Sequence, residues 1–450
     1  MKTFAELCLV CCIVAVMTLV SRQLQQPTPV IVWDAGQYYS MARAFAAGTT
    51  PYAESPYVFR VAVPWLVSRL TPSDPARGFF IVNLASAFAV AMLLAVWLRA
   101  WGITGWISLA MVALFAAAWH GPVRYVYYNP GYVDPPFIAL LLIGLLLIRS
   151  IAKEASTGKI VLLTLLSAGG AFVRETMALV PVCFLLVNNP LGAFAGHRTR
   201  ASTVPKWALA LPLAAGVAAI VFTHQIVAID STERASMMQA AFQWLHKAPD
   251  SLVMGWLAAF GPVLAIAVFD WRGGLRFLAD HEWLAAFFAG CAALSFAGGS
   301  DTERFAFWSL PIVYLLLARA IARHLSVLRR AGLAAAFVIA QAVSARIFWG
   351  IPDPHGETVV ALTTSSGWGG RLYGFLNRLF VIDSFHFNLW SSFGSRPFRL
   401  LRIAVYLVVT GGLLWMMSRR GRSLSASDGE VALGTFGGAS DRAKYGRVVE

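Results

Sequence analysis

Acidic residues that could act as general bases stand at the starts of two helical stretches. The first is Asp34, in the segment 33–38 (WDAGQY) directly after the first apolar block. A carboxylate against apolar walls has a raised pKa, and a neighbouring cation keeps it ionised, which suits a general base. Because Gln37 follows three residues later, Asp34 could instead only cap a helix.

The second aspartate, Asp134, precedes two prolines and a long apolar run. It could line a catalytic cavity or serve only as a helix N-cap, with proline at the first helical positions. Upstream, Arg124 and the tyrosines after it, Tyr128 among them, form a basic and aromatic rim. Such a rim could bind a phosphate and a sugar, although an aromatic belt at a membrane surface has the same composition.

Two further charged groups stand next to apolar runs. Arg174 and Glu175 interrupt the run 160–188, where they could serve a functional site or form an ion pair that only fixes a turn. Asp301, Glu303 and Arg304 open a later apolar run. The two acids could bind a divalent cation together with Asp34, or they could be first-turn acids favoured by the helix dipole.

A long segment near 350–399 carries Asp353, His355 and Glu357 among glycines and aromatic residues. Aromatic side chains between glycines suit sugar stacking or a flap that faces lipid. Long loops within a compact fold usually have a function. His355 is therefore a candidate metal ligand, on the residue type alone.

The composition indicates what must position these side chains. Hydrophobic residues make up 58% of the 450 and charged residues 13%, whereas about a quarter of a soluble domain is charged. The apolar residues come in blocks of the length that a bilayer core requires. The sequence therefore predicts an all-α, polytopic membrane protein and excludes a soluble one. The five cysteines lack metal-ligand spacing and lie in apolar segments.

The apolar blocks predict about twelve transmembrane helices. We divide 160–188 into two short helices at Arg174–Glu175, because a charged pair inside the bilayer is costly. The expected spans are 4–21, 79–98, 104–119, 134–150, 160–173, 176–188, 207–228, 251–269, 283–298, 305–322, 332–349 and 400–417.

The charge distribution orients these spans. With a cytoplasmic N-terminus, every inside loop carries Lys or Arg, as the positive-inside rule requires, and this accounts for the net charge of +14 without nucleic acid. The outer loops hold most candidate acids. Two of them are large, 22–78 and 350–399, and the first should contain two interfacial helices, one starting at Tyr38 and one from Arg60 to about Arg69. In the first of these helices, one face is shared by Tyr38, Met41, Ala42 and Phe45, whereas Ser40 and Arg43 lie off it. We expect one transmembrane domain, 1–417, and a disordered cytoplasmic tail, 418–450.

Together, these motifs resemble the polytopic glycosyltransferases of the GT-C superfamily, which use polyprenyl-phosphate-linked sugars. The resemblance covers mainly 1–322 and lies in the order of short motifs. The motifs are an aspartate after the first helix (Asp34), an Asp-Pro at the start of the fourth (Asp134), a basic residue between two short helices (Arg174) and an arginine-aromatic pair before a late helix (Arg304–Phe305).

The resemblance implies a function as well as a fold. Asp34 would be the general base that activates an acceptor hydroxyl, and Asp134 would line the same cavity. The substrate-binding candidates are Arg60, Arg124, Tyr128, Arg174, Glu175, Asp301, Glu303 and Arg304. The resemblance further implies an inverting transfer from a polyprenyl-phosphate sugar to a lipid or glycan acceptor. The charge distribution places this site on the outer face of the membrane, and the lack of a eukaryotic sorting signal indicates a bacterial inner membrane.

Several alternatives stay open from the sequence. A secondary transporter also has about twelve spans, although transporters place polar groups near the midplane and in repeated halves. A glycan polymerase or ligase would use the same carrier chemistry, and a scaffold would leave the charged residues structural. We expect no required cofactor, with a divalent cation as the alternative, and membrane lipids but no nucleic acid as partners.

Overall fold

The structure, a computed structural model, is helical almost throughout. It describes residues 2–23, 34–119, 121–188, 204–223, 225–228, 247–299, 301–345 and 396–434. In these residues there is no strand beyond one isolated bridge between Tyr52 and Ala228. The α-helices are α1 (Lys2–Gln23), α2 (Asp34–Ala46), α3 (Ala62–Leu70), α4 (Pro75–Ala100), α5 (Trp106–Ala117), α6 (Pro122–Tyr128), α7 (Asp134–Lys153), α8 (Thr157–Val173), α9 (Leu179–Leu185), α11 (Lys206–Thr223), α13 (Pro249–Phe260), α14 (Leu264–Phe269), α15 (Trp271–Ala279), α16 (Glu282–Ala297), α17 (Thr302–Phe307), α18 (Leu310–Arg323), α19 (Leu325–Leu328), α20 (Ala331–Ser344) and α24 (Arg396–Gly434). The same parts of the chain contain four 3-10 turns: η1 (Tyr57–Phe59), η2 (Glu175–Ala178), η3 (Leu186–Asn188) and η4 (Gly261–Val263).

The all-α membrane fold is confirmed, with a difference in helix length. A helix occupies each of the twelve predicted stretches, but in the described chain five helical segments are long and apolar enough to cross a bilayer. The number is six if α15 and α16, which are bent by 114° relative to each other, count as one span. Several others, such as α5 and α20, are apolar but shorter than a full crossing.

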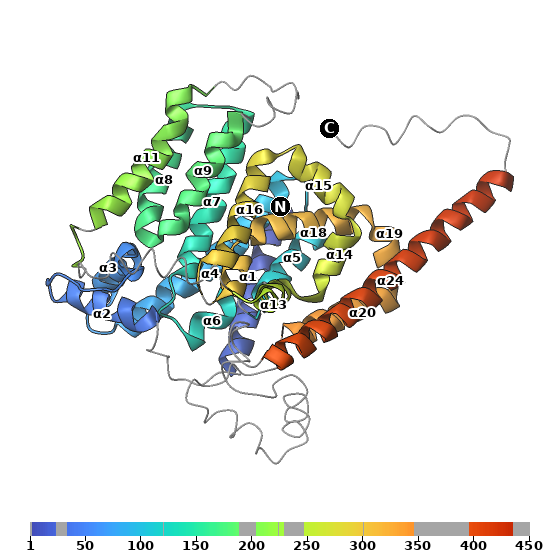
Figure 1. The fold of residues 1–450 in the computed structure, drawn as a ribbon, viewed down its shortest axis with the longest axis horizontal. Coiled ribbons are helices and arrows are strands. Elements are labelled where there is room, and N and C mark those ends of the chain that lie inside the picture. The colour runs from blue at the N-terminus through green and yellow to red at the C-terminus, as the bar shows by residue number, and fades with distance from the viewer. Residues whose placement is uncertain are drawn as a thin grey trace, which may run out of the picture.

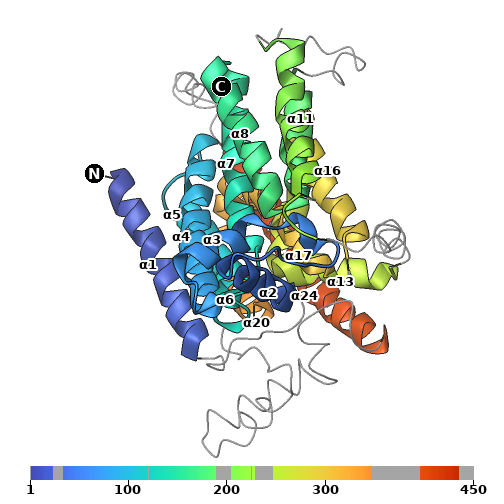
Figure 2. The same cartoon turned by 90° about the vertical axis from the view of Figure 1, so that its left-hand side faces the viewer.

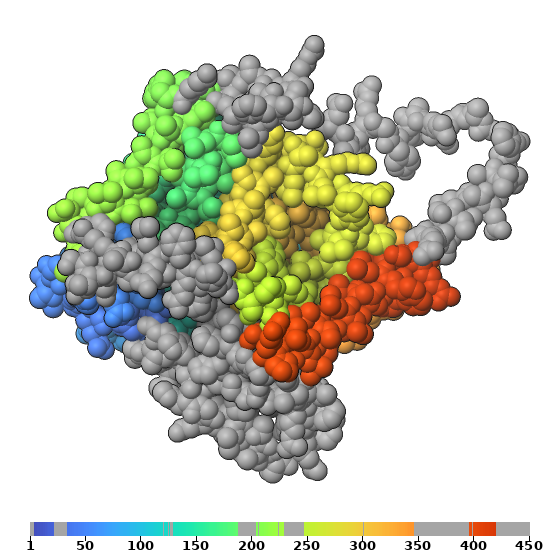
Figure 3. All heavy atoms as spheres, viewed as in Figure 1, coloured from blue at the N-terminus to red at the C-terminus, as the bar shows by residue number. Residues whose placement is uncertain are grey.

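The long spans differ in how deeply they lie within the protein. In α7, 56% of the span is buried, against 22% in α1 and 17% in the span of α24. α7 packs against α4, and α8 packs against α11. α24 lies along the outside of the bundle (Figure 3), where Leu401, Val408 and Trp415 are exposed. α7 is therefore central, whereas α1 and α24 present apolar surface outward.

Local sequence sets the ends of the central helices. Asp74 caps α4 by accepting a hydrogen bond from the Arg77 amide at 3.1 Å, and Pro75 follows at the first helical position. Inside the bundle, the Trp97 indole of α4 donates to the Pro311 carbonyl of α18 at 2.8 Å. This buried bond connects segments more than two hundred residues apart in the chain.

The predicted break within 160–188 is confirmed. α8 ends at Val173, Arg174 is extended with φ −160° and ψ 133°, and the chain re-enters helical structure at Glu175. The charged pair thus lies at a turn between two short helices. Gly144 of α7 allows this region to pack closely, since a Cβ there would lie 2.6 Å from Val180.

Two short helices after α1 lie across one end of the bundle. α2 and α3 lie beside the ends of α7 and α8 in both ribbon views (Figures 1 and 2). The predicted face of α2 is confirmed in its first three residues, because Tyr38, Met41 and Ala42 are buried while Ser40 and Arg43 are exposed. The fourth residue of that face, Phe45, is half-buried. On α3, Trp65 and Leu70 remain about half exposed, as expected of a helix at a membrane surface.

α24 continues past residue 417, where the sequence places the start of a cytoplasmic tail, and ends at Gly434. Residues 435–450 lie outside the described part of the chain. The tail, the domain boundary at 417 and the cytoplasmic position of both termini stay predictions.

Candidate active site

The guanidinium of Arg304 joins three aspartates from three separate segments. Its Nη1 lies 3.1 Å from Asp34 Oδ2 and 3.9 Å from Asp134 Oδ2, and its Nη2 lies 3.0 Å from Asp301 Oδ2. Asp34 begins α2, Asp134 is the first residue of α7, and Asp301 immediately precedes α17. The structure therefore gathers these predicted residues around one cation.

Asp34 is held ionised although it is largely buried. Its side chain is 17% exposed, and Oδ1 accepts a hydrogen bond from the Tyr57 hydroxyl at 2.7 Å. Burial alone would raise the pKa of this carboxyl, but the Arg304 charge, then Arg60 and the Tyr57 bond outweigh it and lower the pKa. Both oxygens thus accept from other segments, which goes beyond what a helix cap requires.

Tyr57 keeps its proton. Burial, together with the nearby Asp34 charge and the hydrogen bond to that carboxylate, raises the pKa of Tyr57 above its usual value. Its hydroxyl therefore donates to Asp34 across the neutral pH range, and it lies in the turn η1 between α2 and α3. The segment between α1 and α4 thus contributes both the carboxylate and the donor that orients it.

Asp134 is held from two sides. Oδ1 accepts from the Trp308 indole at 2.9 Å, and Oδ2 accepts from Arg174 Nη1 at 3.0 Å. Arg174 also lies over the Trp308 ring, 4.5 Å from its centroid. Val133, rather than Asp134, is the N-cap of α7, and no side-chain cap bond is formed there. The Asp134 carboxylate therefore binds residues of other segments and does not cap α7.

Arg174 and Glu175 do not pair with each other. Arg174 pairs with Asp134, and Glu175 pairs with Arg60. Glu175 binds Arg60, with Oε1 2.6 Å from Nη2 and Oε2 2.9 Å from Nε, a two-pronged geometry. Arg60 also donates to the Tyr38 hydroxyl at 3.0 Å. This contact ties α2 and the start of α3 to the turn between α8 and α9.

The ion pairs described above form one charge network, which consists of Asp34, Asp134, Glu175 and Asp301 with Arg60, Arg174 and Arg304. Not every residue predicted for the site belongs to this network. Arg124 is buried in α6, with its guanidinium 5.2 Å from the centre of the Trp119 ring. Glu303 is fully buried and interacts electrostatically with Arg402 and with Lys247, whose pKa burial lowers to about 8. The side chain of Tyr128 and the residues Asp353, His355 and Glu357 lie outside the described part of the structure.

The network leaves guanidinium donors unused. Among the described residues, Arg174 Nε and Nη2 and Arg304 Nε are buried and have no hydrogen-bond partner. Buried donors of this kind are costly to leave unpaired and are usually satisfied in native proteins. Four carboxylates also surround the three arginines of the network, so its cations are already neutralised. A bound anion would therefore use the free N–H groups or displace a carboxylate.

Two site residues were missed by the sequence prediction. Trp308 lies one helical turn beyond Arg304 in the run 302–308, so its position relative to Arg304 was a signal that could have included it. Tyr57 lies in a turn with no periodic pattern, and its contact spans 23 residues. Nothing in the local sequence distinguishes Tyr57 from the other tyrosines.

The chain matches no family model and no curated protein. Two solved structures of the Archaeoglobus fulgidus oligosaccharyltransferase resemble it, one in the apo form and one tethered by a disulfide bond to an acceptor peptide containing the NVT sequon. The identities are 9% and 10%, and the TM-scores are 0.47 and 0.46. Each match covers 82% of this chain, but only 59% and 58% of the other. A likeness this distant says nothing about chemistry, which has to rest on the site itself.

Proposed function

We propose that the chain is a membrane glycosyltransferase that moves a sugar from a polyprenyl-phosphate donor to a hydroxyl of a lipid or glycan acceptor. The observation that carries the proposal is the pairing of the ionised Asp34 with Arg304, next to buried arginine donors that have no partner among the described residues. Glycosyl transfer from a phosphate needs these two kinds of group, a base at the attacking hydroxyl and cations at the departing phosphate.

The proposed reaction follows from this arrangement. The acceptor oxygen forms a bond to the anomeric carbon of the donor, and its proton passes to the Asp34 carboxylate. The bond between the anomeric carbon and the phosphate oxygen breaks, and both of its electrons stay on the phosphate. N–H groups of Arg174 and Arg304 donate to that phosphate, which stabilises the charge that accumulates on it. Attack opposite the leaving group would invert the anomeric configuration.

The position of the charges supports a site at one end of the bundle. Asp134 is the first residue of α7, Arg174 follows the last residue of α8, and α2 lies across these ends (Figure 2). A carrier lipid could reach such a site from the bilayer, while the acceptor approaches from the aqueous side. We assign this end to the outer face of a bacterial inner membrane, following the positive-inside orientation.

A donor comparison tests the proposal. The purified protein, reconstituted in vesicles, is given the same labelled hexose as a polyprenyl phosphate and as a nucleotide sugar, with glycolipid and free glycan acceptors. The proposal expects transfer from the polyprenyl phosphate only. Transfer from the nucleotide sugar, or uptake of a labelled solute without bond cleavage, would contradict it. Divalent-cation dependence is measured in the same assay with and without a chelator.

A further inference from the structure

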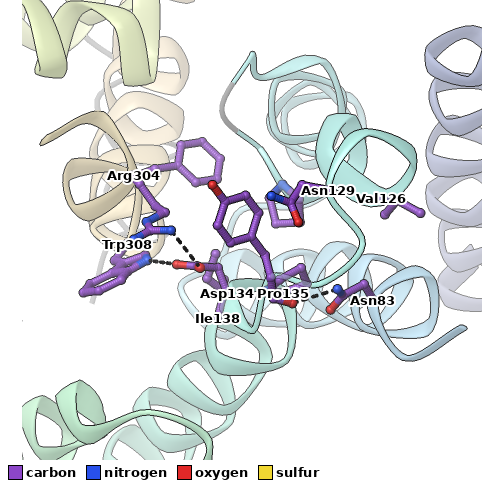
Figure 4. A pocket seen from close by; sticks show the side chains of 11 residues that line it. Asn83, Val126, Asn129, Asp134, Pro135, Ile138, Arg304 and Trp308 are labelled. Atoms are coloured by element: carbon purple, nitrogen blue, oxygen red, sulfur yellow. Dashed lines mark hydrogen bonds and ion pairs between the residues drawn. The ribbon is translucent and has the colours of Figure 1, made fainter. Parts of the chain in front are cut away.

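Two cavities of very different size border α7. The one beside Asp134 and Asn129 (Figure 4) holds about 30 Å3 of solvent-accessible space, which is room for about two water molecules. Water is therefore sufficient to satisfy the polar groups there. The other cavity holds about 320 Å3 and lies at the opposite end of α7. Small-molecule sites typically measure roughly 300–1,000 Å3, so this cavity is large enough for a ligand.

The larger cavity lies at the far side of the bundle from the candidate active site. Arg149 and Lys153, in the last turns of α7, line it, and so do Asp280 and Glu282 at the bend between α15 and α16. α7 has 20 residues and is therefore about 30 Å long, the thickness of a bilayer core, and Asp134 is at its other end. The positive-inside orientation places this cavity at the cytoplasmic face.

The helix α15 indicates that the cavity lies at the depth of lipid headgroups. α15 is bent by 114° relative to α16, so it runs across the direction of that span. In Figure 1 it lies on the upper side of the bundle, whereas α2 and α6 lie on the lower side. One exposed stripe of α15 is apolar (Trp271 and Leu275), and the next is basic (Arg272 and Arg276). Amphipathic helices of this kind lie between the acyl chains and the headgroups.

The cavity is lined by charges of both signs that do not pair with each other. In the described part of the chain, none of the four forms an ion pair, and these are the cations Arg149 and Lys153 and the carboxylates Asp280 and Glu282. Since opposite charges line one space without closing on each other, the cavity matches a ligand that carries both charges. Its anionic end would lie at the cations and its cationic end at the carboxylates.

Arg149 is held in position for such a ligand. Its Nη2 donates to the carbonyl of Ala100, and its guanidinium carbon lies 3.4 Å from the centre of the Trp101 ring. Within the described residues, Arg149 Nε and Glu282 Oε2 are buried and have no hydrogen-bond partner, which costs free energy. The protein thus fixes the arginine by packing but satisfies neither its charge nor that of Glu282.

We propose that this cavity binds a phosphoethanolamine group, with its phosphate at Arg149 and Lys153 and its ammonium at Asp280 and Glu282. A phosphate accepts several hydrogen bonds, and a guanidinium can donate two to it in parallel. Carboxylates only accept, so they select an ammonium that has N–H groups over a trimethylated one. Phosphatidylethanolamine carries this group as its headgroup, and the compound also exists free in solution. The position beside α15 favours the lipid.

Lipid binding tests the proposal without any sugar donor. The full-length protein, purified in detergent and freed of lipid, is mixed with dioleoyl phospholipids that have ethanolamine, choline or glycerol headgroups. Native mass spectrometry counts the lipids that stay bound. We expect the ethanolamine lipid to bind about tenfold more tightly than the other two, which corresponds to ~1.4 kcal/mol.

Substitutions at the two ends of the cavity should act differently. Glu282→Gln removes a carboxylate from the ammonium, so it should weaken the ethanolamine lipid about tenfold and leave the glycerol lipid unchanged. Arg149→Gln removes a cation from the phosphate and should weaken both lipids. A general loss of folding would not distinguish the two lipids. Because Lys153 and Asp280 are exposed, Lys153→Gln and Asp280→Asn repeat this pair of changes without disturbing the packing.

Two exposed residues outside the cavity provide matched controls. Arg276→Gln on α15 and Glu154→Gln after α7 make the same changes and should bind each lipid like the wild type. Free phosphoethanolamine, added as a competitor, identifies the source of the ligand. Displacement of the lipid at comparable concentration would assign the cavity to the soluble compound, and no displacement would assign it to the bilayer lipid.

The proposal has clear contrary outcomes. Equal affinity of the wild type for the three lipids would overturn it, as would tighter binding of the glycerol lipid than of the ethanolamine lipid. Unchanged binding of the ethanolamine lipid in both Glu282→Gln and Arg149→Gln would also overturn it, and the cavity would then hold only water. None of these results bears on glycosyl transfer, because the assay contains no donor and the cavity lies apart from Asp34 and Arg304.

Discussion

Arg304 controls the protonation state of the proposed base. Burial by itself would push the pKa of Asp34 upward, and the neighbouring arginine reverses this effect. Since the folded-state pKa lies below the unfolded value of about 3.9, the contact contributes stability above that value and loses it as the pH falls through the lowered pKa. Asp34 should therefore be ionised throughout the neutral pH range.

The first prediction concerns the pH profile. Arg304→Gln removes the largest cause that lowers the pKa of Asp34 and leaves the burial that raises it. The acidic limb of kcat/KM, which reports the free enzyme, should therefore move to higher pH in this variant, in addition to any loss of rate. Arg272→Gln, at an exposed position of α15, is the control. If the acidic limb of Arg304→Gln lies at the same pH as in the wild type, Asp34 is not the group whose titration the limb reports.

The second prediction concerns the pair of Arg60 and Glu175. Removing one partner of a buried ion pair costs on the order of 3–5 kcal/mol, and less is expected here because the Glu175 side chain is 25% exposed. Arg60→Met should lower the thermal unfolding midpoint in detergent. Adding Glu175→Leu should recover part of that loss, since no charge is then left without its partner. A double variant that is less stable than the single one would contradict this account.

At the scale of elements, close packing positions α2 against the turn that precedes α7. A Cβ at Gly131 would lie 2.6 Å from the Cβ of Ala35, next to Asp34. The same turn carries Asn129, which lies next to Asp134 and Arg304 of the candidate site. The separation between these two segments should therefore matter more for activity than the surrounding apolar contacts do.

The third prediction tests this contact. Gly131→Ala should displace α2 and reduce kcat by about tenfold or more, because misplacement on the order of 1 Å can cost a hundredfold in rate. Gly158→Ala is the matched control, since a Cβ at Gly158 meets nothing within 4 Å, and it should leave kcat unchanged. The same kcat in both variants would show that the approach of α2 to the turn is unimportant.

The sequence predicted the helices of this protein and their breaks well. The break at Arg174 follows from the cost of charge in a bilayer, and the buried face of α2 follows from helical periodicity. Span lengths were predicted less well, because apolar blocks do not reveal bends such as the 114° angle between α15 and α16. The cap interpretation of Asp134 was wrong, since Val133 holds that position and the carboxylate is drawn to Trp308 and Arg174.

At the scale of the whole molecule, the candidate site is assembled from segments that are far apart in the chain. Asp34 and Arg304 are separated by 270 residues, and Asp134 and Trp308 by 174. The sequence could indicate that these residues lie on one face, because their helix ends follow from topology. It could not indicate which carboxylate pairs with which arginine, because that depends on side-chain packing between helices.

The whole-molecule arrangement also bears on the transporter alternative. The network in the described residues lies at helix ends, whereas a transporter is expected to hold polar groups near the midplane. If the site exchanged protons for transport, replacing Asp34 would abolish uptake without affecting any sugar bond. If the site catalyses glycosyl transfer, replacing Asp34 lowers the rate of the chemical step, in which the sugar bond breaks.

The most direct measurement is therefore kcat for transfer from a saturating polyprenyl-phosphate hexose, compared between the wild type and Asp34→Asn. Asp74→Asn serves as the control, because Asp74 caps α4 outside the site and asparagine is an equally good cap. We predict that Asp34→Asn lowers kcat by roughly 10²–10⁴-fold, the usual contribution of a general base, while donor Kd changes little. Wild-type kcat in Asp34→Asn, from folded protein, would contradict the role given to this carboxylate.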